Sequence, residues 1–147
     1  MSLSKKKETM TAKLTLNTRD ELLVIDLERV AYLQADGNYT QIHYMAGERL
    51  TVSLGLAKME ALLAGAFPTG THSPFYRLGR SLIVNQRFLQ NISLPRQKLT
   101  LSDGEGHRHE LTVHKAVLRE YKERFVGKKS NIPLRPTGTS PNIGEEL

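Results

Sequence analysis

The sequence predicts a mainly β protein, built from short antiparallel strands with two short helices. Three observations support this fold class. Apolar and polar residues alternate over segments of five to seven residues, turn-forming residues separate these segments, and apolar residues fall at helical spacing in only two places. Because helices do not alternate with strands, antiparallel sheets packed as a sandwich or roll are favoured over a parallel βαβ sheet.

Five strands are expected before residue 54. Their segments are KLTLNT (13–18), ELLVIDL (21–27), VAYLQAD (30–36), YTQIHYM (39–45) and RLTVS (49–53). Gly37 and Asn38 both tolerate positive φ, so they predict a tight hairpin turn between the third and fourth strands. The stretch Ala-Gly-Glu at 46–48 predicts a second turn before the fifth strand.

The first helix is expected at about 54–64, where the spacing of the apolar residues becomes helical. The apolar positions are Leu54, Leu56, Met59, Leu62 and Leu63. Ser53 is the expected N-cap, since its hydroxyl can accept a hydrogen bond from a backbone amide of the first turn. Gly65 is the expected residue just past the end of the helix.

The second half of the chain continues with strands and ends with the second helix. After a loop at 65–74, the strand segments are FYRL (75–78), FLQNISL (88–94), KLTLS (98–102) and HELTVH (109–114), and the helix is KAVLREYKERF (115–125). Turns are expected at Pro95 and at Asp103–Gly104. The whole chain is therefore expected to contain about eight or nine strands.

A chain of 147 residues suits one domain, because it cannot build two sizeable cores. Residues 13–126 are the expected body, whereas residues 1–12 and 127–147 lack apolar periodicity and are expected to be a disordered tail and a flexible tail. There is no cysteine, no apolar run near the roughly 20 residues of a membrane helix, and no signal-peptide pattern. A cytoplasmic location without membrane attachment is expected.

Charge is unevenly distributed along the chain, whose net charge is +6. Residues 14–63 contain four cations and seven anions, a net charge of −3, and residues 64–126 contain ten cations and five anions, a net charge of +5. Such asymmetry favours a polyanionic partner for the basic half. A solvated surface with uneven charge is the alternative that charge alone leaves open.

No segment has the pattern of a catalytic site, so neither enzyme activity nor a cofactor is expected. Ser81 lacks a nucleophile elbow, and the DGEG stretch at 103–106 lacks the spacing of a phosphate-binding or calcium-binding loop. His107 and His109 would share one face of a strand, as a pair of metal ligands does, but no third ligand of suitable type follows at helical spacing. A metallohydrolase that uses the cluster of His107, His109 and His114 is one alternative. A further alternative is a β-rich protein-interaction module whose basic face meets an acidic protein.

Nucleic-acid binding fits the polar residues better. Arginine binds phosphate, or the O6 and N7 atoms of guanine, as a fork, and asparagine prefers adenine. The candidates lie in separate turns and strand ends: Asn38, Tyr39 and Thr40 on the first hairpin, Arg77, Arg80 and Arg87 around SLIVN (81–85), and His114 and Lys115 at the entry to the last helix. A β-rich protein without a long helix to spare would read DNA with loops.

Four stretches, in order, resemble the LytTR family of bacterial DNA-binding domains, the output modules of many two-component response regulators. The stretches are IDLERVAYLQADGNYTQIHY, SLGLAKMEALL, FYRLGRSLIVNQRFLQNI and LTLSDGEGHRHELTVHKAVLREYKERF. The third is the most specific, and the match runs from about Leu22 to Phe125, nearly the whole body. LytTR domains often follow a receiver domain, and residues 1–12 are too few to contain one.

The resemblance implies an elongated, sandwich-like arrangement of short antiparallel sheets that acts in transcription regulation. It implies that loops enter successive major grooves of double-stranded DNA from one side and bend it. The base-reading loops would fall at Asn38–Thr40, at Arg80 and at His114–Lys115, while Arg77 and Arg87 would meet phosphates. Paired direct repeats, and so a second copy of the chain on the DNA, are also implied.

Two positions depart from the family pattern. The histidine that usually precedes Arg-Ser is Gly79 here, and the closing Pro-Val-Ser-Arg is replaced by Leu-Thr-Val-His-Lys at 111–115. Both departures lie where the family is expected to touch DNA, so they bear on base preference rather than on the fold. Within SLIVN, Ile83 and Val84 are expected in the core, and Asn85 is expected to cap a turn rather than read a base.

Overall fold

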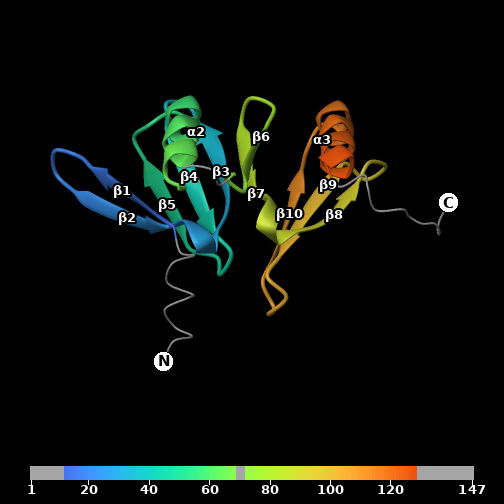
Figure 1. Cartoon of the computed structure of the whole chain (residues 1–147), viewed down its shortest axis with the longest axis horizontal. Coiled ribbons are helices and arrows are strands. Elements are labelled where there is room, and N and C mark those ends of the chain that lie inside the picture. The colour runs from blue at the N-terminus through green and yellow to red at the C-terminus, as the bar shows by residue number, and fades with distance from the viewer. Residues whose placement is uncertain (1–11, 69–71, 129–147) are drawn as a thin grey trace.

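Three antiparallel sheets form the framework of the part of the chain that the structure describes (Figure 1). The structure is a computed structural model, and it describes residues 12–68 and 72–128. These residues contain ten strands, two α-helices and two short 3-10 helices. The predicted fold class, mainly β with short antiparallel sheets and two helices, is confirmed.

A five-stranded sheet lies at the centre of the molecule, with the strand order β5-β4-β3-β7-β6. Its strands are β3 (Val30–Asp36), β4 (Tyr39–Tyr44), β5 (Arg49–Val52), β6 (Phe75–Leu78) and β7 (Leu82–Asn85). Every neighbouring pair is antiparallel. Strands β3 and β7 therefore each have a hydrogen-bonded neighbour along both edges.

Smaller sheets and the helices surround this central sheet. A two-stranded sheet contains β1 (Lys13–Asn17) and β2 (Leu22–Asp26), and a three-stranded sheet contains β8 (Leu89–Ser93), β9 (Lys98–Ser102) and β10 (Arg108–Thr112). The helices are η1 (Leu27–Arg29), α2 (Leu56–Gly65), η2 (Gln86–Phe88) and α3 (Lys115–Lys128). Figure 1 shows the β1–β2 hairpin on one side of the central sheet and the three-stranded sheet with α3 on the other.

Two hydrophobic cores lie on opposite faces of the central sheet. The first core joins the sheet to α2 and to the β1–β2 hairpin, and it includes Leu33 and Ile83. The second core joins the sheet to the three-stranded sheet and to α3, and it includes Tyr32 and Val84. Because successive residues of a strand point to opposite faces, β3 and β7 each supply side chains to both cores.

Strand β7 is enclosed on every side. All four of its residues, Leu-Ile-Val-Asn, are buried. A strand that is paired on both edges and packed on both faces has no side for water, which explains its continuous apolar run. The prediction that Ile83 and Val84 lie in the core is confirmed.

Asn85 ends β7 with two side-chain hydrogen bonds. Its Nδ2 atom donates to the carbonyl oxygen of Val30 at 2.9 Å, and its Oδ1 atom accepts from the backbone N–H of Arg87 at 3.1 Å. The side chain is fully buried. The first bond ties β7 to the start of β3, and the second starts η2, so the predicted turn-capping role is confirmed.

The structure differs from the sequence prediction at several boundaries. SLIVN contains a strand of its own, β7, so the described residues contain ten strands rather than eight or nine. Helix α2 begins two residues later than expected, because Gly55 rather than Ser53 is its N-cap, without a side-chain hydrogen bond. Gly65 is the last residue of α2, and α3 continues to Lys128. Residues 1–11 and 129–147 of the predicted tails lie outside the described residues.

One aromatic stack joins the central sheet to the three-stranded sheet. The rings of Tyr32 and His43 stack at 4.2 Å with an interplanar angle of 9°, and His109 of β10 meets Tyr32 edge-on at 5.6 Å. The Nε2 atom of His43 is buried and has no hydrogen-bond partner. Burial, with the nearby charges of Arg49 and His109, lowers the pKa of His43 below its usual value.

We predict that Asn85→Ala lowers the free energy of unfolding by about 2–4 kcal/mol, since each buried partner left unsatisfied costs about 1–3 kcal/mol. Denaturant titration followed by circular dichroism measures the loss. Asn91→Ala, at an exposed position of β8, is the matched control and should change stability by less than about 0.5 kcal/mol. Equal stability of the two variants would contradict the role given to Asn85.

We predict that His43 makes the fold less stable as the pH falls below about 6.5, the pKa of an unfolded histidine. Because the pKa of His43 is lowered in the fold, the unfolded chain binds more protons between that lowered value and 6.5, which favours unfolding. His43→Phe keeps a flat ring against Tyr32, removes the titration and should flatten the pH dependence of Tm. Exposed His72→Gln is the control, and an unchanged profile for His43→Phe would refute the prediction.

Candidate nucleic-acid interface

Two of the predicted DNA-reading turns lie at the same end of the central sheet. Strands β3 and β7 are antiparallel neighbours with Gln34 opposite Leu82, and the N–H of Ala35 donates to the carbonyl oxygen of Ser81 at 2.9 Å. The β3–β4 turn, with Asn38, follows the end of β3, and the β6–β7 turn, with Arg80, precedes the start of β7. Pairing of β3 with β7 therefore places the two turns side by side.

The N-terminus of α3 joins them at this end. A β-carbon at Gly79 would lie 3.8 Å from the side chain of Val117, so the β6–β7 turn packs against the first turn of α3. His114 caps the helix: its carbonyl oxygen accepts from the N–H of Leu118 at 3.0 Å, and its ring Nδ1 accepts from the N–H of Ala116 at 3.2 Å. Figure 1 shows both turns and this end of α3 along the upper edge.

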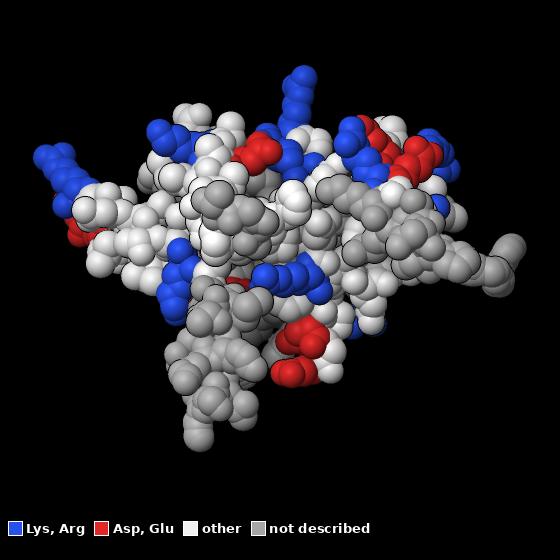
Figure 2. Space-filling view, in the orientation of Figure 1, with Lys and Arg blue, Asp and Glu red and all other residues white. Residues whose placement is uncertain are grey.

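We call this surface the turn edge, and define it by five exposed residues: Asn38, Tyr39, Arg80, His114 and Lys115. Tyr39 is 50% exposed and presents its ring to solvent at this edge. Within the described residues, the guanidinium of Arg80 has no hydrogen-bond or ion-pair partner. Figure 2 shows Lys and Arg side chains along the upper edge, one of them projecting above the β6–β7 turn.

Thr40 does not belong to the turn edge, although the sequence predicted a DNA contact there. Its side chain is fully buried, and its hydroxyl donates to the carbonyl oxygen of Leu54 at 2.8 Å. It points into the first core because it alternates with the exposed Tyr39 along β4. Thr40 therefore supports the first hairpin from inside by tying it to the start of α2.

Arg77 lies below the turn edge and its guanidinium is already occupied. Nη1 donates to Oε1 of Glu60 on α2 at 2.7 Å, Nε donates to the carbonyl oxygen of Gly79 at 3.0 Å, and Nη2 donates to that of Arg80 at 3.0 Å. Three bonds in a fixed fork hold the β6–β7 turn in one shape. The sequence did not predict the supporting role of Glu60, because its partner Arg77 lies seventeen positions away on another element.

Arg87 is not brought to the turn edge. It lies in η2, after the end of β7, whereas Arg80 precedes the start of that strand. The nearest carboxylate is Glu28, at 4.0 Å from Nη1, and the arginine side chain is 44% exposed. The two arginines predicted to meet phosphates thus occupy different settings: Arg77 is partly exposed and bonded to its neighbours beside the β6–β7 turn, and Arg87 lies at the opposite end of β7.

The three histidines considered as metal ligands have separate surroundings. His107 pairs with Asp103 at 2.6 Å across the β9–β10 turn, and this hydrogen bond is the main cause that lowers the pKa of Asp103 to about 2. His109 contacts the carbonyl oxygen of Met45 at 3.2 Å, and His114 caps α3. No group of three acidic or histidine side chains among the described residues could hold a metal ion.

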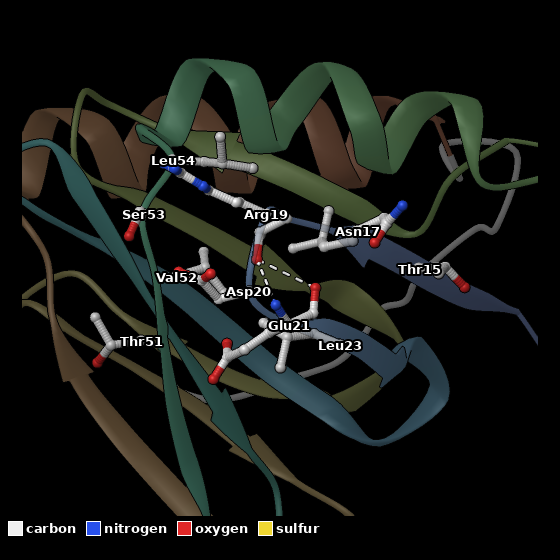
Figure 3. A pocket seen from close by; sticks show the side chains of 12 residues that line it. Thr15, Asn17, Arg19, Asp20, Glu21, Leu23, Thr51, Val52, Ser53 and Leu54 are labelled. Atoms are coloured by element: carbon white, nitrogen blue, oxygen red, sulfur yellow. Dashed lines mark hydrogen bonds between the residues drawn. The ribbon is translucent and has the colours of Figure 1, made fainter.

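A cavity of about 540 Å³ lies between the β1–β2 turn and the segment that joins β5 to α2 (Figure 3). Its wall includes Leu54, whose carbonyl oxygen accepts from Thr40. The charged lining residues Arg19, Asp20 and Glu21 are exposed and carry opposite signs, so no single ligand charge is favoured there.

In the part of the chain that is described, no helix is long and apolar enough to cross a membrane.

Comparison with known proteins identifies the family. The model of the LytTr DNA-binding domain matches residues 20–125, which is most of the chain. This chain belongs to the LytTr DNA-binding domain family. Its functional class is therefore DNA binding in the regulation of transcription.

Individual relatives agree with this assignment. The sensory transduction protein LytT of Oceanobacillus iheyensis is 27% identical over 93 residues, which are 63% of this chain and 35% of that protein. The chain thus spans about a third of the length of this curated relative. The solved LytTr DNA-binding domain of a response regulator from Bacillus cereus has a TM-score of 0.52 at 24% identity, and the match covers 78% of this chain and 96% of that one. That likeness concerns the fold.

Proposed function

We propose that this LytTr domain binds specific DNA sequences by placing the loops of the turn edge in successive major grooves. It acts as the output domain of a bacterial transcription regulator. The observation that carries the proposal is the meeting of three chain segments, distant in sequence, at one exposed edge. A protein without a free helix for the groove needs several loops on one side to read successive windings of DNA.

The side chains of the turn edge have the chemistry to read bases. The unpartnered guanidinium of Arg80 can bind guanine O6 and N7 as a fork, and the amide of Asn38 can pair with adenine. Because Nδ1 of His114 accepts from Ala116, the neutral ring carries its proton on Nε2, which can donate to a base or phosphate. Lys115, beside it, supplies a mobile positive charge for phosphate.

The two remaining arginines have different roles in this proposal. Arg77 positions the turn that carries Arg80, since its guanidinium already binds Glu60 and two carbonyl oxygens of that turn. Arg87 lies at the far end of β7 and is not among the base-reading residues. It remains a proposed phosphate contact only where bent DNA reaches past the turn edge, because a straight duplex would meet that edge alone.

Paired direct repeats, with a second copy of the chain on the DNA, are the proposed target arrangement. Selection of bound duplexes from a random pool, followed by sequencing, tests both sequence preference and repeat structure. Recovery of a recurrent motif supports the proposal. If the chain were instead a protein-interaction module with a basic face, the selection would yield no recurrent motif. Heparin would then compete for the chain as effectively as the selected duplex does.

We predict that Arg80→Ala weakens binding to the selected duplex by about 1–3 kcal/mol and removes discrimination at one base position. Gel-shift titration against duplexes that vary one base pair at a time measures both effects. Arg108→Ala is the matched control, because Arg108 is exposed and lies at the opposite end of β10 from His114. If Arg80→Ala retained both affinity and discrimination, the role assigned to Arg80 would be wrong.

We predict that Arg77→Gln and Glu60→Gln both lower the ratio of specific to non-specific affinity while leaving the salt dependence of binding unchanged. A phosphate contact by Arg77 would instead lower the slope of log K against log salt by about 0.9 in Arg77→Gln alone. Measuring affinity from about 50 to 200 mM salt separates the two roles. Glu60→Gln is decisive, since a carboxylate cannot itself bind a phosphate.

A further inference from the structure

A second cavity lies where the end of β7 meets the C-terminal half of α3. Its volume is about 300 Å³, at the lower end of the range for small-molecule sites. It is lined by Pro74, Tyr76, Gln86, Arg87, Tyr121, Arg124 and Phe125. None of these residues belongs to the turn edge, so the cavity is a separate feature of the molecule.

The inner wall of the cavity is aromatic and held in place. Tyr76 and Tyr121 stack at 4.7 Å with an interplanar angle of 24°, and Phe125 meets Tyr121 edge-on at 6.1 Å. The hydroxyl of Tyr121 donates to Oε1 of Gln86 at 2.8 Å, which ties α3 to η2. Tyr121 is only 2% exposed and anchors the wall, whereas Tyr76 and Phe125 are partly exposed and present the ring surface that a ligand can reach.

The rim of the cavity is cationic. Arg87 and Arg124 line it, and none of the aspartate or glutamate residues that the structure describes does. Their nearest carboxylates are Glu28 at 4.0 Å and Glu120 at 3.5 Å, and the arginine side chains are 44% and 61% exposed. Exposed ion pairs at such distances are weak, so both guanidinium groups can turn to an anion that enters the cavity.

We propose that this cavity binds a small planar organic anion, a flat ring that carries a carboxylate or phosphate group. Aromatic walls favour flat rings by stacking, and guanidinium groups bind carboxylate and phosphate as a fork. The pocket unites both features, with its rings on the inside and its charges at the opening. Neither a neutral ring nor an inorganic anion alone would use both.

The site lies at the far ends of two elements that also form the turn edge. Strand β7 begins just after the turn that carries Arg80 and ends at this cavity, and α3 begins just after His114 and passes the cavity with Tyr121 and Arg124. A ligand here would contact both supports of the turn edge without covering it. Binding of the ligand does not depend on the proposed function.

The proposal is tested by adding matched small molecules to the isotopically labelled chain and following its backbone amide signals by NMR. Adenosine 5′-monophosphate and indole-3-acetate represent the two sources of such an anion, with adenosine, indole-3-acetamide and inorganic phosphate as partial ligands. We expect adenosine 5′-monophosphate or indole-3-acetate to shift the amide signals of Tyr76 and Gln86. Because charge-assisted hydrogen bonds add to the affinity, the dissociation constant of that anion should be about tenfold or more below the constants of the matching compounds that lack either the ring or the charge.

Variants test whether the two arginines hold the anion. Arg87→Gln and Arg124→Gln should each raise the dissociation constant of the bound anion several-fold. Arg119→Gln is the control and should leave that constant unchanged, because Arg119 is exposed on α3 and does not line the cavity. The well-dispersed amide spectrum of each variant confirms folding. The proposal is overturned if neither acid shifts these amides, if a partial ligand binds as tightly as its acid, or if the two arginine variants behave like Arg119→Gln.

Discussion

The architecture of this domain depends on the burial of β3 and β7 between two hydrophobic cores. Each strand is paired along both edges and packed on both faces, so neither can shift without exposing apolar side chains on two sides. A slip of one residue would exchange the side chains of the two cores, which fixes the register strongly. The buried hydrogen bond from Asn85 to Val30 ties the two strands together at one end.

This fixed pairing positions the candidate interface at the other end. The β3–β4 turn follows the end of β3 and the β6–β7 turn precedes the start of β7, which lie side by side, and α3 packs against the β6–β7 turn through Val117. Polar contacts next to the turn edge brace the two turns, with Thr40 bonded to Leu54 and Arg77 bonded to Glu60 and the turn carbonyls. Of the exposed side chains, the guanidinium of Arg80 has no partner among the described residues, whereas the ring of His114 caps α3.

Much of the fold could be predicted from the sequence, because alternating apolar residues and turn residues mark most of its strands. The nine predicted strand segments all overlap observed strands. Strand β7 was hidden because a strand buried on both faces does not alternate, and the N-cap at Gly55 has no side chain to reveal it. Of the predicted contact residues, Asn38, Arg80 and His114 do share one edge, but the burial of Thr40 and the bonds of Arg77 depend on partners far away in the chain, which no local pattern shows.

We propose that three separate segments of the chain meet DNA together on one edge. The most direct test is the amide spectrum of the labelled chain during titration with a selected duplex. The account predicts that the amides of Asn38, Arg80 and Lys115 shift at the same duplex concentration, while those of Asp103 to His107, at the opposite end of β10, stay in place. Shifts centred on the β9–β10 turn or on the β1–β2 hairpin, with the three segments unmoved, would contradict it.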